Sequence, residues 1–234
     1  MGGAGSAGGK VFGRSTAPAH RTLDLAREEA TGFGHRYLGP EHVLLGVLAS
    51  GQLPAAGMLQ AHGVDLLAAR AALVRLAARG VVPAPRPSDA ELLGSLGIDL
   101  AAVARESEQR FGVEAVGEAS WRVTRRHGWG RQVAWTPLCG PPLVAKRALQ
   151  LASETARTLG HGEVGPEHLL LGVLEDARQP PASTRGSRRH RQIMAHVGLP
   201  AGYQGAAGPL LATLGVDPDQ LREAVAAELG SVQR

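Results

Sequence analysis

Two Glu-His pairs, Glu41-His42 and Glu167-His168, are the residues of this chain whose types and spacing could support chemistry. A carboxylate beside an imidazole can take part in acid–base catalysis or in metal binding. Each pair belongs to an eleven-residue stretch that occurs twice, first at 38–48 and again 126 residues later at 164–174, with nine of eleven residues identical. The chain therefore contains two copies of one structural unit, and both copies carry the pair.

Metal binding and catalysis are both weak interpretations of these pairs. Adjacent residues lie about 100° apart around a helix, whereas zinc-binding histidine pairs use a spacing of four residues along one face. No nucleophile and base can be named, and the single cysteine, Cys139, has no activating base near it in sequence. We therefore expect no catalytic residues, no metal and no cofactor, and interpret the recurring histidines as core or capping residues, namely His35, His42, His161 and His168.

The elements that position the pairs are predicted to be buried helices starting at Pro40 and Pro166. Proline suits the first position of a helix, because its φ is already helical and its missing N–H would have had no partner there. The glutamate that follows lies at the positive end of the helix dipole, which favours its charged form. Behind it comes an almost wholly apolar run in which Gly46 and Gly172 would let another backbone approach.

The apolar and small residues recur at helical spacing on either side of these central helices. Aromatic residues make up only 3% of the chain, and alternating strand patterns are scarce. The sequence therefore predicts an all-α protein of two pseudo-symmetric four-helix repeats packed together, with a partial extra helix pair and disordered loops. The predicted segments are a flexible N-terminus at 1–11, repeat 1 at 12–80, a Pro-rich linker at 81–88, a partial repeat at 89–111, an Arg- and Trp-containing loop at 112–140, and repeat 2 at 141–230 with a mobile insertion at 178–208.

Charge is distributed unevenly along the chain. Residues 119–153 and 177–216 hold eleven of the 25 basic residues and no acidic residue, which leaves 14 bases against 21 acids elsewhere. The net charge of +4 thus combines acidic repeats with basic connections. One cysteine excludes an internal disulfide, and the lack of a signal peptide or of an apolar run of membrane-spanning length predicts a cytoplasmic protein without membrane contact.

The two units resemble the Clp N-terminal (Clp R) repeat, the paired helical domain that precedes the ATPase modules of Clp unfoldases. The resemblance rests on Phe12-Gly13-Arg14-x-Thr16, on Gly-His ahead of the eleven-residue stretch, and on Gly63-Val64-Asp65-Leu66. The family usually has Gly-Thr-Glu-His, whereas this chain has Gly-Pro-Glu-His in both copies. The resemblance covers residues 12–79 and 142–230 apart from the insertion, with 89–110 as a partial third copy.

This resemblance implies a surface that docks adaptors and substrates and that, in some members, captures phosphorylated arginine. A carboxylate can accept a guanidinium as a fork while helix N–H groups and a hydroxyl meet a phosphate. In unit 1 the implied pair is Glu41 with Thr16; in unit 2 Pro142 replaces the threonine and cannot donate. The implied ligand-binding residues are Phe12, Arg14, Thr16, Glu41 and Glu167. The alternative is that both glutamates only stabilise their helix starts.

No Gly-x-x-x-x-Gly-Lys-Ser/Thr motif for phosphate binding occurs in the chain. We therefore expect a free-standing, non-enzymatic binding module whose partners are a Clp ATPase, adaptors or client proteins and peptides, and which acts as accessory receptor, decoy or regulator. The alternative is a nucleic-acid-binding regulator that uses the Arg-rich segments 121–131 and 185–191, the first of which interleaves arginine with tryptophan.

Overall fold

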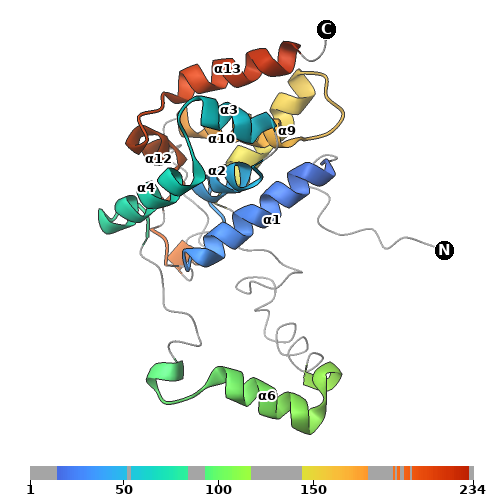
Figure 1. Cartoon of the computed structure of the whole chain (residues 1–234), viewed down its shortest axis with the longest axis vertical. Helices are drawn as coiled ribbons and strands as arrows, with labels where there is room; N and C mark the ends of the chain where they lie inside the picture. The colour runs from blue at the N-terminus through green and yellow to red at the C-terminus, as the bar shows by residue number, and fades with distance from the viewer. Residues whose placement is uncertain are drawn as a thin grey trace, which may run out of the picture.

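The structure is a computed structural model that describes residues 15–51, 54–83, 93–116, 144–178 and 202–231, together with 192, 194–195 and 198–200. The described residues form α-helices and no strand, which confirms the predicted all-α class (Figure 1). The helices are α1 (Ala17–Gly32), α2 (Pro40–Ala49), α3 (Pro54–Ala61), α4 (Leu66–Ala78), α6 (Leu100–Phe111), α9 (Lys146–Thr158), α10 (Pro166–Arg178), α12 (Ala207–Thr213) and α13 (Pro218–Ser231).

The helix boundaries follow from residues that can be recognised in the sequence. α2 and α10 begin at Pro40 and Pro166, as predicted. The side chains of Thr16 and Asp65 cap α1 and α4 by accepting backbone N–H groups of Ala19 at 3.2 Å and Ala68 at 2.8 Å. Four helices, α1 to α4, make up the first repeat, and α9, α10, α12 and α13 make up the second.

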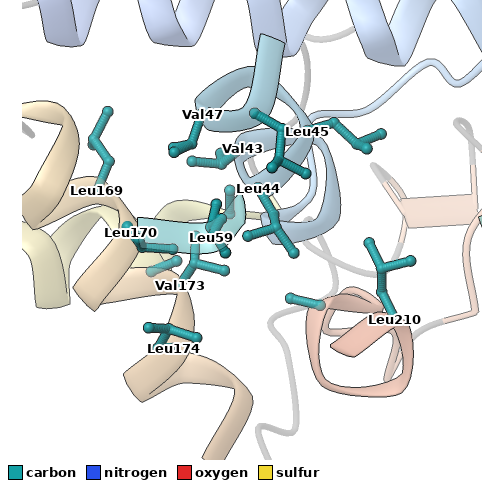
Figure 2. Packing of buried hydrophobic residues seen from close by; sticks show 14 of the residues in the cluster. Val43, Leu44, Leu45, Val47, Leu59, Leu169, Leu170, Val173, Leu174 and Leu210 are labelled. Carbon is teal, nitrogen blue, oxygen red and sulfur yellow. The ribbon is translucent and has the colours of Figure 1, made fainter. Parts of the chain in front are cut away.

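Both repeats share one hydrophobic core built from leucine, valine and alanine. In Figure 2, Val43 and Leu44 of α2 lie in the same cluster as Leu59 of α3, Leu170 of α10 and Leu210 of α12, and all of them are fully buried. The two central helices, α2 and α10, also contact each other directly. A single continuous core explains how repeats too small to be robust alone form a stable body.

One glycine in each repeat permits a close contact between two helices. A Cβ added at Gly46 would lie 2.5 Å from the Thr22 carbonyl oxygen and 2.7 Å from the Ala26 nitrogen. A Cβ at Gly172 would lie 2.2 Å from the Ala148 carbonyl oxygen. The first helix of each repeat therefore packs backbone to backbone against the second, which is the role predicted for these glycines.

Two backbone hydrogen bonds join the repeats crosswise. The N–H of Thr16, before α1, donates to the Val164 carbonyl, before α10, at 3.0 Å. The N–H of Ala145, before α9, donates to the Leu38 carbonyl, before α2, at 2.9 Å. The entry to the first helix of each repeat thus lies beside the entry to the second helix of the other repeat.

The partial third copy forms a helix, α6, that lies apart from the bundle (Figure 1). None of its described side chains is buried, and Val103 and Phe111 are 49% and 70% exposed. The equivalent helix of repeat 1 is α4, which supplies Leu73 and Leu76 to the core. At the corresponding positions α6 has Ser107 and Arg110. The copy has kept the helix and its Asp99 cap but has lost residues that would hold it in a core.

Several predicted segments fall outside the described residues. They include Phe12, Arg14, both Arg-rich segments and most of the loop predicted at 112–140, of which residues 113–116 form a helical turn. The end of the predicted insertion, by contrast, is described, and part of it is packed. Among the described residues no single helix is long and apolar enough to span a membrane; α2 and α3 meet the length and composition test only as a pair bent by 100°.

Candidate ligand-binding site at the two Gly-Pro-Glu-His turns

Each residue of the Gly-Pro-Glu-His turn has a separate task. Proline starts the helix, and glycine before it leaves room for the glutamate side chain to fold back over the helix N-terminus. A Cβ on Gly39 would lie 2.3 Å from Glu41 Oε1, and one on Gly165 would lie 2.7 Å from Glu167 Oε2. The turn therefore places a carboxylate over the free N–H groups at the start of α2 and of α10.

The histidine of the turn caps the helix. The Gly39 N–H donates to His42 Nδ1 at 3.0 Å, so a neutral His42 carries its proton on Nε2 and donates it to His35 Nδ1 at 2.8 Å. Repeat 2 has the same chain, from Gly165 through His168 to His161, with distances of 2.8 and 2.6 Å. His42 and His168 are therefore capping residues, and His35 and His161 are their hydrogen-bond partners.

Burial keeps His35, His42 and His168 uncharged. It lowers the pKa of His42 to about 3 and is the first cause that lowers the pKa of His35 to about 4, with repulsion from His42 second. Burial, followed by repulsion from His161, lowers the pKa of His168 to about 4. In the part of the chain that the structure describes, no three His, Cys, Asp or Glu side chains come together as metal ligands would.

Glu41 is fully buried and already holds two donors. Its Oε2 accepts the backbone N–H of Ala206 at 2.8 Å, and its Oε1 accepts the hydroxyl of Tyr203 at 3.1 Å. Both donors come from the end of the predicted insertion in repeat 2. The carboxylate of repeat 1 is therefore satisfied by the protein itself.

The donors of Glu41 continue into a second tyrosine. Tyr37 and Tyr203 hydroxyl oxygens lie 3.1 Å apart, and since Tyr203 gives its proton to Glu41, Tyr37 is the donor between them. Burial first, and the charge of Glu41 second, raise the pKa of both phenols far above the usual value, so both stay protonated. Tyr37 packs with Met194 and Leu199 in a small apolar cluster that anchors the insertion.

Glu167 has the same position in repeat 2 but different surroundings. Its side chain is partly exposed, and no group among the described residues donates a hydrogen bond to it. Val164 lies three residues before Glu167, and its carbonyl accepts the Thr16 N–H. The two equivalent carboxylates thus differ: one is closed and one is accessible.

The structure separates the residues that the sequence placed in one site. Thr16 is hydrogen bonded to the stretch that leads to Glu167, and its hydroxyl caps α1. Glu41 lies under the insertion, with Tyr203 and Ala206. Sequence reasoning missed these two residues and Tyr37, although the chain has only two tyrosines and one of them stands between glycines in an otherwise polar insertion.

The comparison with known families agrees with this geometry. Residues 14–117 match the Clp repeat (R) N-terminal domain, which covers repeat 1 and the partial copy. Over 220 residues and 94% of its length the chain is 28% identical to chaperone protein ClpC1, chloroplastic, of Oryza sativa subsp. japonica. Residues 14–117 therefore belong to the Clp repeat (R) N-terminal domain family.

Other relatives extend the Clp N-terminal family resemblance to a bacterial chaperone. Chaperone protein ClpB of Oceanobacillus iheyensis is 27% identical over 207 residues, which is 85% of this chain. The chain spans 16% of the rice ClpC1 protein and 19% of the ClpB protein, so it corresponds to a small part of each.

A solved structure shows the same Clp N-terminal fold over both repeats. The N-terminal domain of the caseinolytic protease associated chaperone ClpD from Arabidopsis thaliana superposes with a TM-score of 0.53 and covers 95% of this chain and 99% of that one. Its sequence identity is 18%, and the likeness therefore concerns the fold.

The two glutamates allow a matched prediction for stability. Glu41→Gln should lower the free energy of unfolding by about 2 kcal/mol, because a buried, charge-assisted acceptor of two hydrogen bonds is lost. Glu167→Gln, at a partly exposed carboxylate without a described donor, should change it by less than about 0.5 kcal/mol. Urea unfolding followed by circular dichroism measures both; equal effects would contradict the difference between the two turns.

Proposed function

We propose that the chain is a non-enzymatic docking module for proteins or peptides of Clp-dependent proteolysis in the cytoplasm, acting as accessory receptor, decoy or regulator. Membership of residues 14–117 in the Clp repeat (R) N-terminal domain family supports the docking role. The observation that carries the proposal is the accessible carboxylate of Glu167, held over the N-terminus of α10 by its Gly-Pro-Glu-His turn. Such a group can accept a guanidinium or another cationic side chain of a bound peptide.

The proposed ligand site combines Glu167 with Thr16 of the other repeat. The carboxylate would accept the guanidinium of a phosphorylated arginine, while N–H groups at the start of α10 and the Thr16 hydroxyl would meet its phosphate. The backbone hydrogen bond between Thr16 and Val164 supports this pairing, because it holds Thr16 beside the turn that carries Glu167. Glu41 is proposed as a second acceptor only when its internal donors are removed.

Titration with phosphoarginine, followed by backbone amide shifts, tests this site. We expect saturable shifts at Gly165, Glu167, His168 and Thr16, and their loss in Glu167→Gln. Thr16→Ser, which keeps the hydroxyl and the helix cap, should bind, whereas Thr16→Ala should bind at least about tenfold more weakly. Arginine without the phosphate is the control. Absence of shifts at α10 in the wild-type chain would refute the site.

A capture experiment tests the wider role. Immobilised wild-type chain should retain Clp ATPases, adaptors or their client proteins from lysate, and Glu167→Gln should retain less of them. Recovery of none of these by the wild-type chain would count against a role in Clp-dependent proteolysis.

A further inference from the structure

A short segment of repeat 2, residues 202–206, occupies the Glu41 carboxylate as a bound peptide would; we call it the strap. Its two donors, the Tyr203 hydroxyl and the Ala206 N–H, take one oxygen each of Glu41. The Tyr203 ring stacks edge-on against Tyr37, with centroids 5.5 Å apart. The contact combines a main-chain bond, a side-chain bond and an aromatic pocket, which are the elements of peptide recognition.

The strap fits because residue 205 is glycine. Gly205 has φ of +100°, and a Cβ there would lie 2.3 Å from the Pro40 ring and 2.9 Å from Glu41 Oε2. Gly202, three residues earlier, has open space around its Cα and needs no positive φ. The seat on Pro40 and Glu41 therefore selects glycine at one strap position and accepts other small residues at the other.

The chain length between the helices explains why only repeat 1 is occupied. The connection from α10 to α12 runs over residues 179–206, whereas the equivalent connection from α2 to α3 covers only residues 50–53. The long insertion can reach across to repeat 1, while the short connection cannot reach Glu167. The closed and open turns are thus a consequence of one insertion.

On one side the strap rests against Pro40 and Glu41. Its other side borders a cavity of about 310 Å³ that is also lined by Asp176 of α10 and Pro209 of α12. Tyr203, Gln204 and Gly205 are partly exposed. These three residues lie outside the shared core, whereas Ala206 is fully buried in it. Tyr203 also packs against the small cluster of Tyr37, Met194 and Leu199. The part of the strap that can leave its seat without opening the shared core is therefore residues 202–205.

We propose that the strap is an internal ligand of the Glu41 turn and that this seat takes an uncharged peptide segment of the pattern Tyr-x-Gly-Ala, read through a phenol and a backbone N–H. The two turns then differ in occupancy: the strap fills the turn at Glu41, and one external guanidinium ligand binds per chain, at Glu167. The expected stoichiometry of one external ligand per chain rests on the proposed function. The binding of the strap to Glu41 does not depend on it.

The first experiment compares two glycine substitutions within the strap. Gly205→Ala should release it, seen as amide exchange at Ala206 at least about tenfold faster than in the wild-type chain, with shifts at Gly39 and His42. Gly202→Ala is the matched control and should change neither. Tyr203→Phe, which keeps the ring and its packing against Tyr37 but removes one donor to Glu41, should accelerate exchange at Ala206 by a smaller factor. Unchanged exchange at Ala206 in Gly205→Ala would overturn the proposal.

The second experiment restores the strap in trans. A synthetic peptide of residues 199–207, added to the Gly205→Ala chain, should shift the Gly39 and His42 amides saturably and leave Gly165 unchanged. The same peptide with phenylalanine for tyrosine should bind about tenfold more weakly. A peptide that shifts neither turn, or both turns equally, contradicts a seat specific to Glu41.

Phosphoarginine then separates the two proposals. The wild-type chain should bind one equivalent and Gly205→Ala two, the second with shifts at Gly39 and His42. Binding at neither turn, with the peptide still seated at Glu41, would refute the proposed function and leave the strap intact. If the wild-type chain bound two equivalents while the Ala206 amide stayed protected from exchange, the strap would not block the Glu41 turn, and the proposal would be overturned.

Discussion

Gly46→Ala and Gly172→Ala should each lower the free energy of unfolding by about 3 kcal/mol, which corresponds to a melting temperature lower by about 6–12 °C. The added methyl group would meet backbone atoms of α1 or α9 at 2.2–2.7 Å. Backbone atoms cannot swing aside as the end of a side chain can, so the two helices would have to separate. Thermal unfolding followed by circular dichroism measures the loss.

Gly57→Ala provides the matched control. Gly57 also lies within a helix, α3, but a Cβ there would meet nothing within 4 Å. The same substitution should therefore raise stability by about 0.5–1 kcal/mol, because alanine is the better helix former. If all three variants shifted the melting temperature alike, close helix packing would not be the reason for glycine at 46 and 172.

Acid should unfold this protein through its buried imidazoles. In the unfolded chain their pKa values lie near 6.5, whereas His35 and His168 titrate at about 4 and His42 at about 3 in the fold. Between these values the unfolded state binds more protons than the native state. Their stabilising contribution is therefore complete above about pH 6.5 and is lost progressively as the pH falls towards 4. Urea unfolding at half-unit steps of pH measures the slope.

Substitution of the capping histidines tests the origin of this slope. The double variant His42→Gln, His168→Gln keeps an acceptor for the Gly39 and Gly165 N–H groups but cannot titrate, so its stability should vary less between pH 6.5 and 4. His20→Gln, at an exposed position of α1, is the control and should keep the wild-type slope. A double variant with an unchanged slope would assign the acid sensitivity to other groups.

The repeat and its helices could be predicted from the sequence because their signals are local. Proline at the first helical position and aspartate or threonine caps mark the starts of α1, α2, α4 and α10, and the apolar run of the central helices indicates burial. The roles of Gly46 and Gly172 followed from glycine inside an apolar helix. These features depend on residues within a few positions of one another.

The difference between Glu41 and Glu167 could not be predicted, because it depends on a contact across 165 residues. The sequence predicted the insertion to be a mobile connection. It has no periodic apolar pattern that would indicate where Tyr203 binds. The pairing of Thr16 with repeat 2 is equally non-local, since a duplicated sequence suggests that partners lie within one copy. The two Gly-Pro-Glu-His turns are identical in sequence. They differ as sites because the insertion of repeat 2 covers Glu41 and leaves Glu167 partly exposed.

The crosswise backbone bonds, Thr16 to Val164 and Ala145 to Leu38, bear on how such a domain can be inherited. Each copy completes the helix entry of its sibling, so a gene fragment that encodes one copy would yield a chain with two main-chain groups stripped of their partners and half a core exposed. The smallest piece that recombination can transplant is the pair. Gain or loss of a lone copy would be tolerated only as an appendage, as with α6, whose described side chains contribute nothing to the shared interior.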